Sequence, residues 1–252
     1  MYPNPLKQKL ANGELVLGTA LSAPTAGVTA ATCRTGIDFI WMDTEHAPYG
    51  SEALEVLPVL ARQNGVAPMI RVAWNDPALI KKAYDVGAVA VMVPQVDTAE
   101  EAARAVEYAY YPPMGQRGVS PNWPIISGDD WGHVIRTAND ETVLIVQIES
   151  RQAYENIEEI AKVPGVDVVF MGPMDLSASL GVITQMQDPA LQEIMREAPR
   201  RLAELGMVAG TTLMDIDEVR QKIEWGYHFM NVGSPLAYGV QALTGHLTSL
   251  RG

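Results

Sequence analysis

Short apolar runs recur along the chain, and each is continuous rather than alternating between apolar and polar residues. Continuous runs of this length are typical of strands in a parallel sheet that is covered on both faces. The runs predicted to be strands are VLGTAL (16–21), FIWMD (39–43), APMIRV (67–72), AVMVPQV (90–96), VLIVQIE (143–149), VDVVFMG (166–172), MVAGTTL (207–213) and FMNVGS (229–234).

The stretches between these runs carry helical patterning. Helices are predicted at 24–35, 51–64, 76–86, 98–110, 151–162, 188–205 and 215–225. Several begin with capping chemistry, at Ser51, Asp76-Pro77 and Asp188-Pro189. Eight strands alternating with helices in 252 residues predict an α/β fold of the (β/α)8 TIM-barrel type.

A doubly wound sheet is the alternative fold, but the first predicted strand is not followed by a glycine-rich phosphate loop. Neither G-x-G-x-x-G nor G-x-x-x-x-G-K occurs, so no nucleotide cofactor is expected. No linker divides the chain, which predicts a single barrel domain over residues 1–252. One long segment, 111–134, is rich in proline, glycine and tryptophan and is expected to be a functional lid or an interface element.

Composition narrows the class of protein. The formal net charge is −12, and phosphate backbones require a basic face, so nucleic acid is not expected as a partner. The single cysteine, Cys33, excludes an intramolecular disulfide and a cysteine metal cluster. The amino-terminal residues lack the apolar core of a signal peptide, and no run approaches 18 apolar residues. A soluble cytoplasmic protein that does not bind membranes is therefore expected.

Polar residues follow the predicted strands at their carboxyl ends, which is where (β/α)8 barrels carry their active sites. In chain order they are Asp43, Glu45, His46, Arg71, Gln95, Gln147, Glu149, Asp175, Thr211, Thr212 and Ser234. Of the four histidines, only His46 lies at a strand end, so it is a candidate general base.

Glu149 and Asp175 are one strand–helix–strand step apart and should stand on neighbouring strand ends. Adjacent carboxylates repel unless a proton or cation lies between them, and oxygen ligands favour Mg²⁺, Mn²⁺ or Co²⁺. The alternative is that both residues only cap helices. Arg71 offers a planar fork of donors for a carbonyl or carboxylate oxygen, or it pairs with Asp43 or Glu45.

The lysines exclude one kind of chemistry. They are Lys7, Lys9, Lys81, Lys82, Lys162 and Lys222, and none lies in or at the end of a predicted strand. A Schiff-base aldolase needs a lysine inside the barrel, so imine chemistry is not expected. An enolate would instead need a metal ion and Arg71 for its stabilisation.

Several of these residues occur in stretches that together resemble the HpcH/HpaI family of metal-dependent (class II) pyruvate aldolases. The stretches are D-T-E-H-A-P (43–48), P-M-I-R-V (68–72), Y-P-P-M-G-Q-R-G-V (111–119), V-Q-I-E-S (146–150), G-P-M-D-L-S-A-S-L-G (172–181) and G-S-P (233–235). The resemblance covers almost the whole chain. It implies a (β/α)8 barrel whose last helix is exchanged between paired subunits, in hexamers that are trimers of dimers.

The resemblance also implies an activity, namely reversible cleavage of a 4-hydroxy-2-oxo acid to pyruvate and an aldehyde. Carried over by residue, Glu149 and Asp175 would bind the divalent metal, and Arg71 the keto oxygen. Gln147 would contact pyruvate or support the site, and the backbone N–H groups of Met174 and Asp175 would cradle the carboxylate. His46 would be the base, acting through water with Asp85 as its partner.

Asp85 lies at the end of a predicted helix, and helices of this fold return to the face opposite the active site. A pair between Asp85 and His46 therefore requires Asp85 from a neighbouring subunit. The chain also departs from the family pattern at Thr44, at Met174, in SPNWPIISGDDWGHV and in G-T-T-L (210–213). These positions face the aldehyde side, so the acceptor stays open, as does a related 2-oxo acid such as hydroxypyruvate in place of pyruvate.

Two rival functions remain at this stage. A CoA-ester lyase of the citrate-lyase-β or malyl-CoA type shares the barrel and the carboxylates, but it needs a basic surface for CoA phosphates that this chain lacks near its strand ends. A non-catalytic barrel that binds a 2-oxo acid is the other rival. The complete set of Arg71, His46, Glu149 and Asp175 argues against it.

Overall fold

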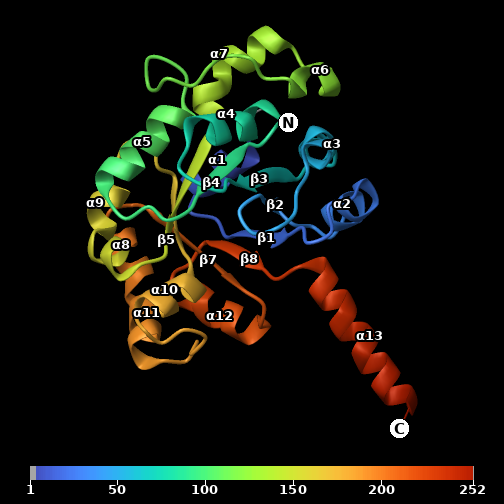
Figure 1. Ribbon diagram of the computed structural model, residues 1–252, viewed down its shortest axis with the longest axis vertical. Helices are drawn as coiled ribbons and strands as arrows, with labels where there is room; N and C mark the ends of the chain where they lie inside the picture. Colours follow the sequence, from blue (N-terminus) through green and yellow to red (C-terminus); the bar gives the residue numbers. More distant parts are fainter. Residues whose placement is uncertain (1–3, 252) are drawn as a thin grey trace.

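The computed structural model describes residues 4–251, and its eight parallel strands close into one barrel in chain order (Figure 1). The strands are β1 (Val16–Ala20), β2 (Phe39–Asp43), β3 (Ala67–Arg71), β4 (Ala90–Val93), β5 (Val143–Ile148), β6 (Val168–Met171), β7 (Val208–Leu213) and β8 (Phe229–Val232). Each strand pairs with the next, and β8 pairs with β1. The predicted (β/α)8 barrel is thus confirmed, and the doubly wound sheet is excluded.

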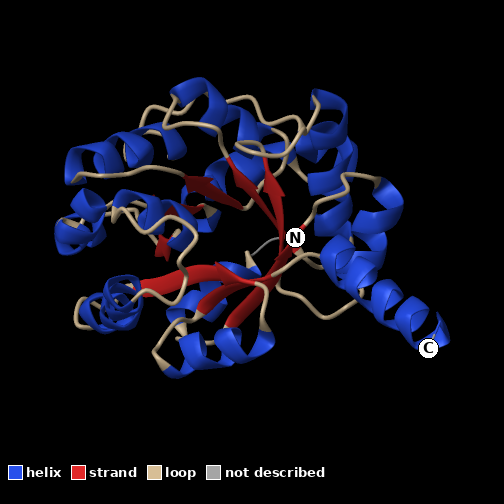
Figure 2. Cartoon of the chain, turned by 60° about the horizontal axis from the view of Figure 1, so that its bottom comes forward, coloured by secondary structure: helices blue, strands red, loops and turns tan. Residues whose placement is uncertain are grey.

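Most of the helices surround the strands on the outside, as Figure 2 shows with helices in blue and strands in red. The helices are α1 (Pro5–Ala11), α2 (Ala26–Cys33), α3 (Ser51–Gln63), α4 (Pro77–Asp85), α5 (Ala99–Ala109), α6 (Trp123–Ser127), α7 (Trp131–Glu141), α8 (Arg151–Glu155), α9 (Ile157–Ala161), α10 (Pro173–Ser179), α11 (Pro189–Ala203), α12 (Ile216–Glu224) and α13 (Pro235–Arg251).

Large side chains fill the inside of the barrel. Phe39 and Phe229 stack with ring centroids 4.4 Å apart, and Phe170 meets Phe229 edge-on at 6.4 Å. Gly18 makes room for them, since a Cβ there would lie 2.4 Å from the Phe39 ring. Burial of each phenylalanine contributes about 1.5–3 kcal/mol. The barrel interior is therefore packed core, not a channel.

Helix α1 closes the barrel at the amino ends of the strands. Its Leu6 is fully buried against the phenylalanine cluster. Asn4 caps α1 by accepting the Leu6 N–H, and its side-chain amide donates to the carbonyl of Val89, just before β4. The opposite end of the barrel, at the carboxyl ends of the strands, is left to form a pocket.

All eight predicted strands are present, but α1 and the part of α7 after residue 134 were not predicted. Three predictions also differ from the structure. Residues 111–134, expected to be irregular, contain α6 and the start of α7. The helix predicted at 151–162 is divided at Asn156 into α8 and α9. Asp76 and Asp188 cap their helices as expected, but α3 is capped by Gly50, and Ser51 is its first residue.

Helix α13 leaves the barrel after β8 and extends away from it (Figure 1). None of its residues is buried. Its exposed large apolar residues recur at alternating spacings of four and three, a pattern that places them along one face of a helix: Leu236, Val240, Leu243, Leu247 and Leu250. No helix among residues 4–251 is long and apolar enough to cross a bilayer. The expected domain of residues 1–252 extends past the described residues at both ends.

Candidate active site

A pocket of about 530 Å³ lies at the carboxyl ends of the strands. It is lined by residues of six strands and of the loops that follow them: Ala20, Trp41, Asp43, His46, Arg71, Gln147, Gly172, Pro173, Met174, Asp175, Met186, Thr212, Leu213, Met214 and Asn231. Six of the residues singled out at strand ends from the sequence are thus brought together, and Glu149 lies against Gly172 at the pocket wall.

Arg71 and Asp43 form the firmest contact in the pocket. The register of β2 and β3 sets them side by side, and Arg71 donates from Nε to Asp43 Oδ1 at 2.9 Å and from Nη2 to Oδ2 at 2.6 Å. Burial alone would raise the pKa of Asp43, but the Arg71 guanidinium more than offsets it and holds that pKa below its usual value. The two hydrogen bonds fix the plane of the guanidinium, so the remaining nitrogen, Nη1, donates its hydrogen bonds in a fixed direction.

Nη1 of Arg71 faces two further acceptors. Glu45 Oε2 lies 3.0 Å away as an ion pair, and Gln147 Oε1 accepts a longer hydrogen bond of 3.5 Å. Burial raises the pKa of Glu45, and Arg71 only partly opposes that rise. Arg71 therefore pairs with Asp43 and Glu45, as the alternative interpretation of the sequence expected. It also lines the pocket.

Asp43 also shapes the turn that carries His46. Its Oδ1 accepts the backbone N–H groups of Glu45 at 3.1 Å and His46 at 3.4 Å. The His46 side chain is 64% exposed, and its Nε2 lies 3.8 Å from Glu45 Oε2. The imidazole is thus held at the pocket mouth by its backbone and keeps its ring nitrogens accessible to a ligand.

Glu149 lies deeper than His46, at 6% exposure. Its Oε2 accepts the backbone N–H of Gln95 at 3.0 Å, and Gln95 adopts a left-handed conformation with φ of 52° to present that N–H. A Cβ at Gly172 would lie 2.7 Å from Glu149 Cγ and 3.0 Å from Gln147 Nε2, so both polar side chains depend on this glycine. Burial, reinforced by the charges of Asp175 and Glu45, raises the pKa of Glu149 to about 7.

Met174 and Asp175 lie in the first turn of α10, which begins at Pro173 after the Gly172 N-cap. Backbone N–H groups in the first turn of a helix have no acceptor within it, so those of Met174 and Asp175 are available to a ligand. Both side chains are exposed. The charge of Asp175 acts on Glu149 and on Glu45, so the three carboxylates share one neighbourhood.

This donor set fits a divalent cation. The carboxylates of Asp43, Glu45, Glu149 and Asp175 share the pocket with one guanidinium, and the charges of Asp175 and Glu45 add to the effect of burial in raising the pKa of Glu149. Carboxylate oxygens are the ligands of hard cations. Within residues 4–251, no three His, Cys, Asp or Glu side chains form a complete metal cage. A cation held by Glu149 and Asp175 would keep open positions for oxygen atoms of a substrate.

Asp85 is not part of this pocket. It ends α4, and its backbone carbonyl accepts the N–H of Asn122, at the amino-end face of the barrel. In the described chain its Oδ1 is buried without a hydrogen-bond partner. Burial raises the pKa of Asp85 to about 6, against the opposing charges of Arg117, Lys81 and Lys82. His46 and Asp85 of one chain thus lie at opposite ends of the barrel.

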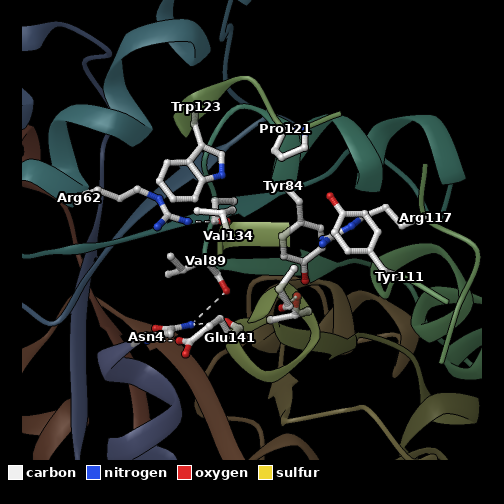
Figure 3. Close-up of a pocket in the computed structure, with 13 residues that line it drawn as sticks. Asn4, Arg62, Tyr84, Val89, Tyr111, Arg117, Pro121, Trp123, Val134 and Glu141 are labelled. Atoms are coloured by element: carbon white, nitrogen blue, oxygen red, sulfur yellow. Dashed lines mark hydrogen bonds between the residues drawn. The ribbon is translucent and has the colours of Figure 1, made fainter. Parts of the chain in front are cut away.

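A small cavity of about 30 Å³, drawn in Figure 3, is lined by Tyr84, which precedes Asp85 in α4. The Arg117 guanidinium lies 4.6 Å from the Tyr84 ring centroid and 3.9 Å from that of Tyr111. On the other side of the cavity, Arg62 lies over the Trp123 ring. The segment 111–134 therefore packs against the end of α4 and not over the pocket of its own chain.

Among the pocket residues that the sequence did not single out, two carry side-chain polar atoms. Trp41 and Asn231 lie inside runs that read as uniformly buried strands, and both line the pocket. Every second side chain of a strand points to the same face, and this alternation would have identified them. Trp41 shares a strand face with Asp43, and Asn231 shares one with Phe229, which points into the barrel.

Comparisons with known proteins place these observations in context. The HpcH/HpaI aldolase/citrate lyase family matches residues 21–241. The 2-keto-3-deoxy-L-rhamnonate aldolase of Escherichia coli K12 is 36% identical over 236 residues, which cover 92% of this chain and 88% of that protein. Among solved structures, a HpcH/HpaI aldolase/citrate lyase family protein from Burkholderia cenocepacia J2315 has a TM-score of 0.93 at 31% identity, covering 99% and 100% of the two chains. The HpcH/HpaI aldolase from Desulfitobacterium hafniense DCB-2 has a TM-score of 0.88 at 32% identity, covering 96% and 95%.

Proposed function

The chain belongs to the HpcH/HpaI aldolase/citrate lyase family, and we propose that it is a metal-dependent aldolase, a carbon–carbon lyase. Its substrate is a 4-hydroxy-2-oxo acid of the 2-keto-3-deoxy type, cleaved reversibly to pyruvate, or a related 2-oxo acid, and an aldehyde. Relatives named 2-keto-3-deoxy-L-rhamnonate aldolase support this substrate class.

The observation that carries the proposal is the placement of one fixed guanidinium beside an excess of carboxylates in a single pocket. Asp43 holds Arg71 by two hydrogen bonds, while Glu149 and Asp175 stand close enough for their charges to interact. A site that only bound a 2-oxo acid would gain from positive charge alone. The combination of a guanidinium with several carboxylates suits a negatively charged substrate that binds together with a cation held by the carboxylates.

Glu149 and Asp175 would hold the divalent ion, Mg²⁺, Mn²⁺ or Co²⁺. When bound, the ion supplies positive charge against the oxygen atoms of the 2-oxo acid. Arg71 adds a donor toward the keto oxygen from Nη1, and Gln147 lies beside it. The N–H groups of Met174 and Asp175 bind the carboxylate, as groups at a helix start do.

His46 acts on the other half of the substrate. It accepts the proton of the C4 hydroxyl, directly or through a water molecule, and the C3–C4 bond breaks as the aldehyde carbonyl forms. The electrons of that bond remain on the 2-oxo acid, whose developing charge lies beside Arg71. In the direction of synthesis, His46 returns the proton to the new hydroxyl.

We further propose that the working protein is an oligomer, a hexamer arranged as a trimer of dimers. Asp85 lies too far from His46 of its own chain, so a neighbouring subunit supplies it. Its buried Oδ1 has no partner in the described chain, which leaves an acceptor for an imidazole N–H. The unburied apolar face of α13 supports exchange of this helix with the paired subunit.

Incorporation of solvent deuterium into the methyl group of pyruvate tests the function, because this exchange requires proton removal at C3 and needs no aldehyde. We expect exchange with Mg²⁺ or Mn²⁺ and none after chelation. Glu149→Gln should lose it while the fold is retained, and Glu155→Gln, an exposed glutamate on α8, is the matched control. Full exchange in verified metal-free protein, or no exchange under any metal, contradicts the proposal.

A further inference from the structure

Two buried polar atoms in the pocket floor have no hydrogen-bond partner among the described residues. They are Nε1 of Trp41, on β2, and Oδ1 of Asn231, on β8. Trp41 is 5% exposed and Asn231 is 3% exposed, yet both line the 530 Å³ pocket. Buried polar atoms are almost always paired, and an exception requires an explanation.

Both side chains are held in place by their neighbours. Asn231 donates from Nδ2 to Thr212 Oγ1 on β7 at 2.8 Å, which leaves its Oδ1 as the free end of the amide. The Trp41 ring meets Phe170 edge-on at 5.8 Å, and the Arg71 guanidinium lies 4.9 Å from its centroid. Neither polar atom can turn away without breaking these contacts.

The strand between them keeps the space open. Strand β1 pairs with both β2 and β8, and its register sets Ala20 beside Trp41 and Gly18 beside Asn231. These two small residues are the ones that β1 contributes on this side of the barrel. Ala20 lines the same pocket as Trp41 and Asn231, so a larger side chain at residue 20 would reduce the space beside them.

The chemistry of the two atoms defines the group that they accept. An indole N–H can only donate, and an amide oxygen can only accept. A hydroxyl group satisfies both, because it accepts from one and donates to the other. A carboxylate or ketone oxygen would leave Asn231 Oδ1 facing another acceptor, and an ammonium group would leave Trp41 Nε1 facing another donor.

We propose that Trp41 and Asn231 form a hydroxyl-binding subsite that selects hydroxylated substrates. The proposal rests on the aldolase function and names a group its substrate must carry. Thr212 is a positioning residue, since it orients the Asn231 amide. The hydroxyl has two chemical sources, C3 of a 3-hydroxy-2-oxo acid such as hydroxypyruvate, or the carbon chain of the aldehyde.

Aldol addition with matched substrate pairs tests the subsite. One pair compares hydroxypyruvate with pyruvate as nucleophile, using propanal as acceptor, and the other compares lactaldehyde with propanal, using pyruvate as nucleophile. We expect wild-type kcat/KM to favour the hydroxylated member of one pair by about tenfold, the order of one buried neutral hydrogen-bond pair. The pair that shows the preference identifies the source of the hydroxyl.

Trp41→Phe removes the N–H and keeps a ring, and Asn231→Ala removes the acceptor. Each should reduce the preference about tenfold, to near unity, whereas Trp225→Phe, the same change on the outer surface beyond α12, should leave it intact. Thr212→Val should reduce it in part. A preference that is absent in wild type, or that survives both Trp41→Phe and Asn231→Ala, overturns the subsite.

Binding measured by calorimetry separates this proposal from the aldolase function. Dissociation constants of hydroxypyruvate and pyruvate, and of lactaldehyde and propanal, are compared in wild type and both variants. If wild type binds the hydroxylated compound selectively, the variants lose that selectivity and no turnover occurs, the aldolase function is contradicted and the subsite is retained. If turnover occurs without selectivity, the subsite is contradicted and the aldolase function is retained.

Discussion

Asp43 explains why a buried strand ends in two carboxylates and an imidazole. Its two oxygens accept four hydrogen bonds, two from Arg71 and two from the backbone of Glu45 and His46. One side chain thus orients the guanidinium and fixes the turn that carries His46. The cost of burying Asp43 is offset because Arg71 is buried beside it.

Arg71→Lys should lower kcat for aldol cleavage by about 10²-fold or more, as for loss of a donor that stabilises developing negative charge. Lysine keeps the charge but lacks the planar fork that meets Asp43 with two donors and Gln147 with a third. Arg104→Lys, an exposed change on α5, is the control. A rate within a factor of three of wild type would assign Arg71 to structure alone.

Gly172→Ala should weaken metal binding by about 10- to 100-fold, the range seen when the support of a metal ligand is lost. The added Cβ would lie 2.7 Å from Glu149 Cγ, so the carboxylate must move. Titration of metal binding against Gly27→Ala, where the added carbon meets nothing within 4 Å, isolates the effect. Equal metal affinity in the two variants would show that Glu149 is not a ligand.

At the scale of elements, apolar continuity and helix caps were enough to predict all eight strands and seven helical stretches. They could not predict α6 in residues 111–134, because Trp123 and Pro124 become buried only by packing against other segments. The same continuity concealed Trp41, since a fully buried run does not say which face of the strand looks into the barrel. Tertiary contacts decided both cases.

The prediction at the scale of elements concerns helix α13. Leu243→Glu combined with Leu247→Glu should reduce the oligomeric mass measured by light scattering, because two charges then lie on the apolar face expected to be covered by a partner. The barrel should keep its circular dichroism spectrum, since α13 contributes no buried residue to it.

Gln241→Glu combined with Thr248→Glu places the same charges on other positions of this helix and should leave the mass unchanged. An unchanged mass in the Leu243 and Leu247 variant would contradict helix exchange.

For the whole molecule, the separation of His46 from Asp85 predicts that catalysis depends on assembly. His46→Ala and Asp85→Asn subunits should each lose about 10²–10⁴-fold in cleavage rate when assembled alone, the usual contribution of a general base. When the two are mixed before assembly, about a quarter of the sites in a random cyclic arrangement combine the two wild-type residues. Recovered activity near that fraction is expected.

The control mixes His46→Ala with His46→Ala that also carries Asp85→Asn, a combination in which no site regains His46. Confirmed mixed oligomers without recovery would mean that Asp85 does not act across the subunit boundary.

The packed interior of the barrel has a consequence for the order of events in turnover. Leu6 and the phenylalanine cluster close the amino end of the barrel, so reactant and products use the same entrance. Glu149 lies at the inner wall with 6% exposure, whereas the His46 side chain stands at the mouth with 64% exposure. With the proposed roles of these residues, we expect the 2-oxo acid to bind behind the aldehyde and to leave second. In the direction of cleavage, pyruvate should therefore inhibit competitively against the substrate, and the aldehyde should inhibit noncompetitively. The reversed pattern would require a second exit.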